Sequence, residues 1–277
     1  MTPLVVAALL LAGAREQRMA EAPFTLATVA LQRAVMPGRK ELVAACSKRW
    51  GDSLPLTIPE TEEPLPSLPP GATEATQLDL PTGRVVVALS PTPLPAMKPA
   101  PEDTAFPGAF AVLSGHKAKL IVFFFTRQHD AVDRALILTR VMACLLDVTP
   151  AVAVLWRMSA TPPGRFLELS KDMGRRNLPL PLWVATTGVK LEGPDQRFQI
   201  HTYGMGHLGR RELGAIGRDP HETARLLYQV GQRVIDKNAD LKDGERVDLG
   251  GTRKIKTRLG KAPWDSPPGE KMTWLDL

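Results

Sequence analysis

The centre of the chain alternates between two kinds of hydrophobic pattern. Residues 117–125 are a near-continuous apolar run of strand length, rich in β-branched and aromatic side chains, and residues 151–156 are a second such run. Between them, residues 130–147 place apolar side chains at the spacing of one helix face. Apolar runs of this length are typical of strands that are buried on both faces. We therefore expect a strand–helix–strand unit, with a crossover helix, at the centre of the sheet.

Apolar spacing and turn residues predict the other elements. A helix is expected at residues 39–50, followed by the stop signal Gly51, and another after Thr161 and Pro162. A third is expected at residues 219–236, because Asp219 to Glu222 forms a capping box with proline at the first helical position. Strands are expected at residues 24–31, 76–80, 84–89, 180–186, 197–203, 247–249 and 254–259.

The order of these elements predicts an α+β fold. We expect two α/β-plait (ferredoxin-like) halves packed together, with a mixed, mainly antiparallel sheet and helices on one side. The expected domain covers residues 19–261, with halves at about 24–110 and 115–261. A proline-rich loop at residues 53–72 interrupts the first half, and residues 262–277 form a C-terminal tail that its tryptophans pin to the body.

The amino terminus bears on the compartment. Residues 1–14 resemble the apolar region of a signal peptide, but no lysine or arginine precedes them, and the run is too short to span a bilayer. Residues 1–18 are therefore a disordered extension, an artefact of a start codon that is really Met19, or an export signal. We expect a cytoplasmic protein without a membrane segment, with export as the alternative.

The two cysteines predict neither a metal site nor a disulfide framework. Cys46 and Cys144 each lie among apolar neighbours in a helical pattern, so both are expected to be buried thiols. No CxxC pair and no Cys/His cluster indicates zinc. The net charge of +6 is mildly basic and implies at most a weak attraction for anions.

One glycine-rich stretch could carry chemistry. Residues 204–209 match GxGxxG, but the next helix starts about ten residues too late for a dinucleotide site. A tight turn with positive backbone angles is the simpler interpretation. The enzyme alternative would use His201, His207 and Glu212 as its polar set, without a metal or another cofactor. The candidate functional loop comprises His201, Tyr203, Gly204, Gly206, His207, Gly209 and Glu212.

A second candidate is a basic patch near the carboxyl terminus. Arg253, Lys254, Lys256 and Arg258 alternate with apolar residues. This alternation is typical of a half-buried edge strand, where lysine prevents aggregation. A nucleic-acid surface is the sharper hypothesis, but aromatic residues are not interleaved with the basic ones. Nucleic acid is therefore not the expected partner.

Several sequence blocks together resemble a known family. They lie at residues 88–95, 115–118, 143–146, 151–156, 181–184 and 201–213. The chain from about Phe24 to Leu259 resembles the bacterial family called domain of unknown function 4261. The resemblance implies a compact bacterial protein, usually without a signal peptide, and it supplies no catalytic residues.

The expected function follows from the absence of a convergent polar motif. We expect a non-catalytic protein-binding protein, with an immunity or accessory role in a toxin or secretion system suggested by analogy alone. Its partner would then be another protein, such as a toxin or a secretion-system component. An enzyme needs its polar side chains to converge in a pocket, whereas a binding protein needs an exposed apolar surface.

Overall fold

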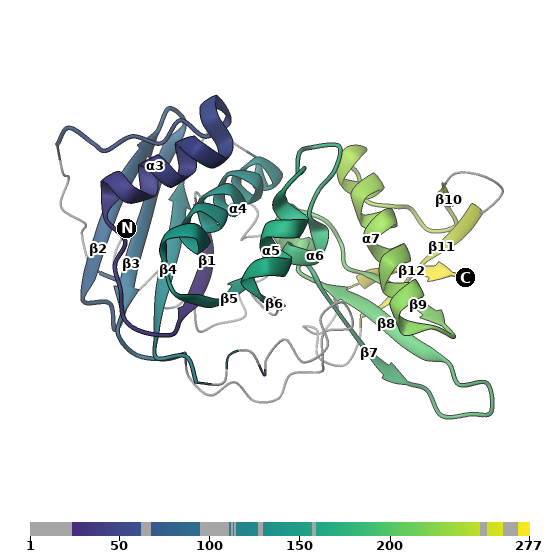
Figure 1. The fold of residues 1–277 in the computed structure, drawn as a ribbon. Helices are drawn as coiled ribbons and strands as arrows, with labels where there is room; N and C mark the ends of the chain where they lie inside the picture. Colours follow the sequence, from purple (N-terminus) through teal and green to yellow (C-terminus); the bar gives the residue numbers. More distant parts are fainter. Residues whose placement is uncertain are drawn as a thin grey trace.

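The computed structural model describes residues 24–61, 68–94, 111, 113, 115–126, 130–156, 159–249, 254–262 and 271–277. The strands form two six-stranded sheets, both mainly antiparallel, and the main helices lie on one side of them (Figure 1). The expected α+β fold is thereby confirmed. The predicted extension at residues 1–18 lies outside the described residues, as does most of the proline-rich stretch after Leu94. Within the described part, no helix is long and apolar enough to cross a membrane.

The first sheet contains the predicted central unit. Its strands run in the order β2-β3-β4-β1-β5-β6. They are β1 (Phe24–Leu31), β2 (Glu74–Leu80), β3 (Gly83–Ser90), β4 (Ala118–Phe125), β5 (Ala151–Trp156) and β6 (Ser159–Thr161). Helix α4 (Ala131–Val148) connects β4 to β5, and β1 lies between them, antiparallel to both. The order β3-β4-β1-β5 is that of an α/β-plait, to which β2 and β6 add one strand at each edge.

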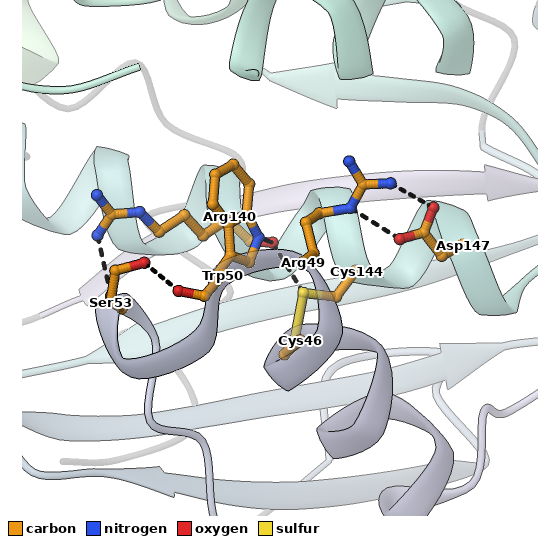
Figure 2. Close-up of a disulfide and its surroundings, with 7 residues drawn as sticks. All are labelled: Cys46, Arg49, Trp50, Ser53, Arg140, Cys144 and Asp147. Carbon is orange, nitrogen blue, oxygen red and sulfur yellow. Dashed lines mark hydrogen bonds and ion pairs between the residues drawn. A yellow bond between two sulfur atoms is a disulfide. The ribbon is translucent and has the colours of Figure 1, made fainter. Parts of the chain in front are cut away.

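Helix α3 (Arg39–Trp50) packs beside α4, and the short helix η1 (Gly51–Ser53) follows it. A disulfide joins Cys46 to Cys144, with Cα atoms 5.2 Å apart (Figure 2). Arg49 donates to both carboxylate oxygens of Asp147, at 2.8 and 2.6 Å. The prediction of two buried thiols was wrong: both residues are buried, but they are bonded. They lie 98 positions apart, and only the packing of α3 on α4 brings them together.

The second sheet runs in the order β10-β11-β12-β9-β8-β7. Its strands are β7 (Ala185–Lys190), β8 (Phe198–Tyr203), β9 (Leu213–Gly217), β10 (Arg246–Asp248), β11 (Lys254–Lys261) and β12 (Lys271–Asp276). Helix α7 (Pro220–Asp236) covers β8 and β9, and Asp219 caps its first turn by accepting from His221 N and Glu222 N. Strand β12 runs parallel to β9 in the middle of the sheet, so the predicted carboxyl-terminal tail is partly a central strand.

The two sheets divide the chain between residues 161 and 185 rather than near residues 110–115. This difference arises because β4 and β5 pair with β1 and not with the later strands. Helices α5 (Pro163–Ser170) and α6 (Leu180–Trp183) occupy the crossing. A strand was predicted at residues 180–186, but its first part is the helical turn α6, since Pro181 has no N–H to donate to a strand ladder.

Helix α6 also joins the cores of the two halves. Trp183 is 1% exposed, and its Nε1 donates to Thr139 Oγ1 of α4 at 2.8 Å. Its ring centroid lies 6.2 Å from that of Trp156 on β5. One continuous apolar cluster therefore extends from the first sheet to the second. The proline-rich loop at residues 53–72 also contributes: Leu54 and Leu56 are buried, and residues 62–67 lie outside the described part.

Candidate functional site

The Gly204–Glu212 loop connects β8 to β9 and contains the short helix η3 (Met205–Leu208). Glu212 organises it. One carboxylate oxygen accepts from Gly204 N at 2.9 Å and Gly206 N at 3.1 Å, and the other accepts from Thr202 Oγ1 at 2.6 Å. Hydrogen bonds from such a set of neighbouring donors fix a turn. The carboxylate therefore serves the loop's own backbone.

Positive backbone angles were predicted for the glycines of this loop, and two of them have such angles. Gly204 has φ 124° and Gly209 has φ 71°, both in the region that favours glycine. Gly206 lies inside η3 and is not among the residues with positive φ. A Cβ atom on Gly204 would also lie 2.8 Å from the carbonyl oxygen of Trp183. The GxGxxG pattern at residues 204–209 therefore reflects the geometry of a tight turn, as predicted.

The polar residues proposed for an enzyme do not lie on one side of the sheet. His201 and Thr202 are neighbours on β8, so their side chains point to opposite faces, and Glu212 lies with Thr202. His201 is buried, with 6% exposure, and Tyr203 and His207 are half-buried. The Nε2 atom of His207 is itself buried. No group of potential metal ligands occurs among the described residues.

The basic patch lies on β11. Lys254, Lys256 and Arg258 are exposed and alternate with the buried Ile255 and Thr257, as predicted. Arg253 lies outside the described residues. The strand is not at the edge of the sheet, however, because β10 pairs with it on one side and β12 on the other. Its lysines therefore do not protect an open strand edge, and they require another explanation.

A groove that was not predicted lies beside α7, which Figure 1 draws in green. It has a volume of about 720 Å³. Leu178, Leu180, Pro181, Tyr228 and Leu249 contribute the apolar part of its lining. Gln232 fixes one wall by accepting from Leu178 N at 2.8 Å and donating to the Arg175 carbonyl at 3.1 Å. The shape of the groove is therefore held by bonds between α7 and the segment before α6.

Basic side chains form the rim of this groove. Arg176, Arg225 and Arg233 are exposed, and none has an ion-pair partner among the described residues. The neighbouring Arg175 differs, because it pairs with Asp130 at 2.5 Å and Asp133 at 2.6 Å. Its hydrogen bonds to Asp133 and Asp130 raise the pKa of Arg175. The rim therefore has three guanidinium groups available to a ligand.

The spacing of polar residues in the sequence could have indicated one side of the groove. Every fourth position from Arg225 is polar: Gln229 and Arg233 follow on α7, and Lys237 caps its end. Residues at this spacing align on one helix face. Their spacing marks a basic stripe. It could not indicate that an apolar hollow runs beside the stripe, because the other wall comes from residues 176–181, far away in the sequence.

Comparison with known proteins finds a similarity for one part of the chain. No curated protein and no solved structure matches it. A family model does match residues 201–275, which include the Gly204–Glu212 loop, α7 and the strands from β9 to β12. The match is shorter than the resemblance expected from Phe24 to Leu259 and lies in the second sheet. Over residues 201–275 the chain matches the family described as Domain of unknown function (DUF4261), as its sequence blocks predicted.

Proposed function

We propose that the chain is a non-catalytic protein-binding protein whose α7 groove receives an acidic, partly apolar segment of its partner. The observation that carries this proposal is the groove: Arg176, Arg225 and Arg233 lie above an apolar lining and have no ion-pair partner in the part of the chain that the structure describes. Carboxylates of the partner would pair with these guanidinium groups, which form planar, bidentate contacts. Complementary charge of this kind selects a partner and speeds its association.

The distribution of exposed apolar side chains supports a groove rather than a flat interface. The large apolar residues that are exposed in the described part of the chain are Ile58, Leu68, Phe125 and Leu277. This is a small set for a wide apolar interface, which needs a contiguous patch of several hundred Å². The apolar surface beside α7 is instead recessed, where a side chain from a partner can be enclosed.

A peptide-binding measurement tests the proposal. Fluorescence anisotropy of a labelled peptide of alternating glutamate and leucine should show saturable binding to the full chain. Reversing two rim charges, with Arg225→Glu and Arg233→Glu, should lower affinity by at least about tenfold, or ~1.4 kcal/mol in total, because two favourable charge contacts are replaced by two repulsive ones. A peptide of alternating lysine and leucine should not bind.

The matched control reverses the same amount of charge elsewhere. Lys40 and Lys48 are exposed on α3, in the other half of the molecule. The double variant Lys40→Glu and Lys48→Glu should bind the acidic peptide as the wild type does, apart from a small effect of net charge. Equal loss of affinity in both double variants, or no binding by the wild type, would contradict the groove as the site.

The contacts favour binding over the alternative of a hydrolase-like enzyme at the Gly204–Glu212 loop. Glu212 already accepts from Thr202, Gly204 and Gly206. A general base must instead reach the proton that it abstracts, within about 3 Å. The rim of the groove, by contrast, carries the guanidinium groups of Arg176, Arg225 and Arg233, which form no ion pair within the described residues.

The biological setting is a further part of this proposal. An immunity or accessory role in a bacterial toxin or secretion system is supported only by analogy with small bacterial proteins of this kind. Co-expression with a toxin encoded beside the gene tests it: the full chain should restore growth, and the Arg225→Glu, Arg233→Glu variant should not. Of the two compartments considered, the cytoplasm and the cell exterior, the Cys46–Cys144 bond favours export, because disulfides persist in oxidising compartments.

A further inference from the structure

An indole ring lies across the face of the second sheet that is opposite α7. The core side chains Leu275 and Ile255 face the helix, so the alternate residues of β12 and β11, Trp274 among them, face the other way. In the strand register Trp274 is opposite Arg258 of β11 on one side and Gly214 of β9 on the other. The ring is thus central in the sheet.

Two glycines make room for this ring. A Cβ atom on Gly214 would lie 2.6 Å from Met272 Cε and 3.0 Å from the Trp274 atoms Cε3 and Cζ3, and a Cβ atom on Gly260 would lie 2.6 Å from Trp274 Cδ1. The indole therefore lies close to the sheet and reaches over both neighbouring strands. Its Nε1 donates to the Lys261 carbonyl at 3.2 Å, and the side chain is only half-buried. The ring therefore rests on the backbone of the two neighbouring strands and keeps part of its surface accessible.

Basic side chains lie on the same face of the sheet as the ring. Lys254, Lys256 and Arg258 project from β11 on the same side, and Arg246 of β10 is opposite Lys256 in the register. Two carboxylates, Asp248 and Asp276, lie among them. The closest approach of Arg258 to Asp276 is 4.0 Å, between side chains that are 64% and 51% exposed. Such a loose, solvated pair leaves the guanidinium available to another anion.

We propose that this face binds single-stranded nucleic acid, with a base stacked on Trp274 and phosphates held by Lys254, Lys256 and Arg258. An aromatic ring on a sheet surface flanked by cations is the combination by which proteins hold unpaired strands. The basic strand itself contains no aromatic residue, but the neighbouring strand supplies one. An acidic peptide could use the cations, but its carboxylates would gain nothing from the flat ring. This site is separate from the α7 groove.

Binding of a labelled oligothymidine about twelve nucleotides long, within the usual site size of a stacking platform, tests the proposal. Anisotropy should report saturable binding to the full chain. Trp274→Ala should weaken affinity about tenfold, the size of one stacking contact, whereas Trp274→Phe should retain most of it. The double variant Lys254→Gln and Lys256→Gln should reduce the slope of log affinity against log salt by ~1.4, at ~0.7 for each phosphate contact.

The controls separate this site from general charge attraction and from the groove. The double variant Arg225→Gln and Arg233→Gln removes equal charge beside α7 and should change neither the oligonucleotide affinity nor the salt slope. Circular dichroism establishes that each variant is folded. If Trp274→Ala unfolds, the lysine and arginine double variants still test whether the oligonucleotide binds at this face. Their four substituted side chains are exposed, so both variants should fold.

Several results would overturn the inference. They are the absence of saturable binding by the wild type, equal affinity of the folded Trp274→Ala variant, and an unchanged salt slope for the lysine variant. Competition by polyglutamate as effective as that by unlabelled oligothymidine would assign the face to acidic peptides instead. If the wild type binds the acidic peptide but not the oligonucleotide, the inference about the Trp274 face has failed. If it binds the oligonucleotide but not the peptide, the proposal for the α7 groove has failed.

Discussion

Gly204, Gly244 and Gly174 differ in how strongly their surroundings require glycine. Gly204 combines φ 124° with a backbone oxygen 2.8 Å from the place a Cβ would take, Gly244 has φ 73° in open space, and Gly174 has open space alone. Alanine at Gly204 should therefore cost more than about 1 kcal/mol, at Gly244 about 1 kcal/mol, and at Gly174 close to nothing. Urea denaturation of the three single variants measures this order. An equal cost at all three positions would show that backbone geometry is not the reason for glycine at position 204.

Residue types in the Gly204–Glu212 loop were predictable, whereas their partnerships were not. The sequence identifies Gly204 and Gly209 as positions for unusual backbone angles, and both have them. It also groups His201 with Glu212 as a polar set. The structure separates that pair, because adjacent residues of a strand face opposite ways and Glu212 bonds to Thr202. Spacing along the chain does not state which sheet face a loop residue will approach.

At the scale of elements, helices α3 and α4 are joined by more than apolar packing. The Cys46–Cys144 bond closes a loop between residues that are 98 positions apart. Closing a loop of this length restricts the unfolded chain, and such bonds contribute about 2–4 kcal/mol to stability. Urea denaturation of the full chain with and without dithiothreitol should show this loss on reduction.

The control for the reductant is the double variant Cys46→Ser and Cys144→Ser. It should be less stable than the oxidised wild type and should not respond to dithiothreitol. Alkylation by iodoacetamide in urea without reductant gives an independent readout, since bonded cysteines stay unmodified. Quantitative modification of both cysteines in freshly isolated protein would contradict the bond and restore the interpretation as thiols.

The elements with a strong apolar pattern were predictable, and those defined by remote partners were not. Strands β1 and β5 and helix α3 have the predicted bounds. Strand β9 was missed because its glycines indicate a turn, although Gly214 is needed beneath the ring of Trp274. Strand β12 was missed because it follows a proline-rich stretch and has buried residues on both faces. In both cases the pairing that makes the strand comes from elsewhere in the chain.

At the scale of the whole molecule, the division into two sheets does not divide the core. The order of elements along the chain predicts the fold class. It does not predict where the chain divides between the sheets, because β1 pairs with both β4 and β5. Trp183 lies where the halves meet, with Trp156 of the first sheet beside it and Thr139 accepting its N–H. The halves should therefore depend on each other for stability.

The last prediction concerns this dependence. In urea, hydrogen exchange followed by mass spectrometry should show peptides of β4 and of β9 losing protection in one transition, because a continuous core unfolds as a unit. Trp183→Ala should shift the transition of both peptides to lower urea. The free energy of unfolding derived from it should fall by about 3–5 kcal/mol, the cost of removing a buried tryptophan side chain. Trp183→Phe keeps an aromatic ring but not the hydrogen bond to Thr139, so its smaller cost separates packing from bonding. If β9 loses protection at a lower urea concentration than β4 in the wild type, the halves are independent domains, and Trp183 only lines the boundary between them.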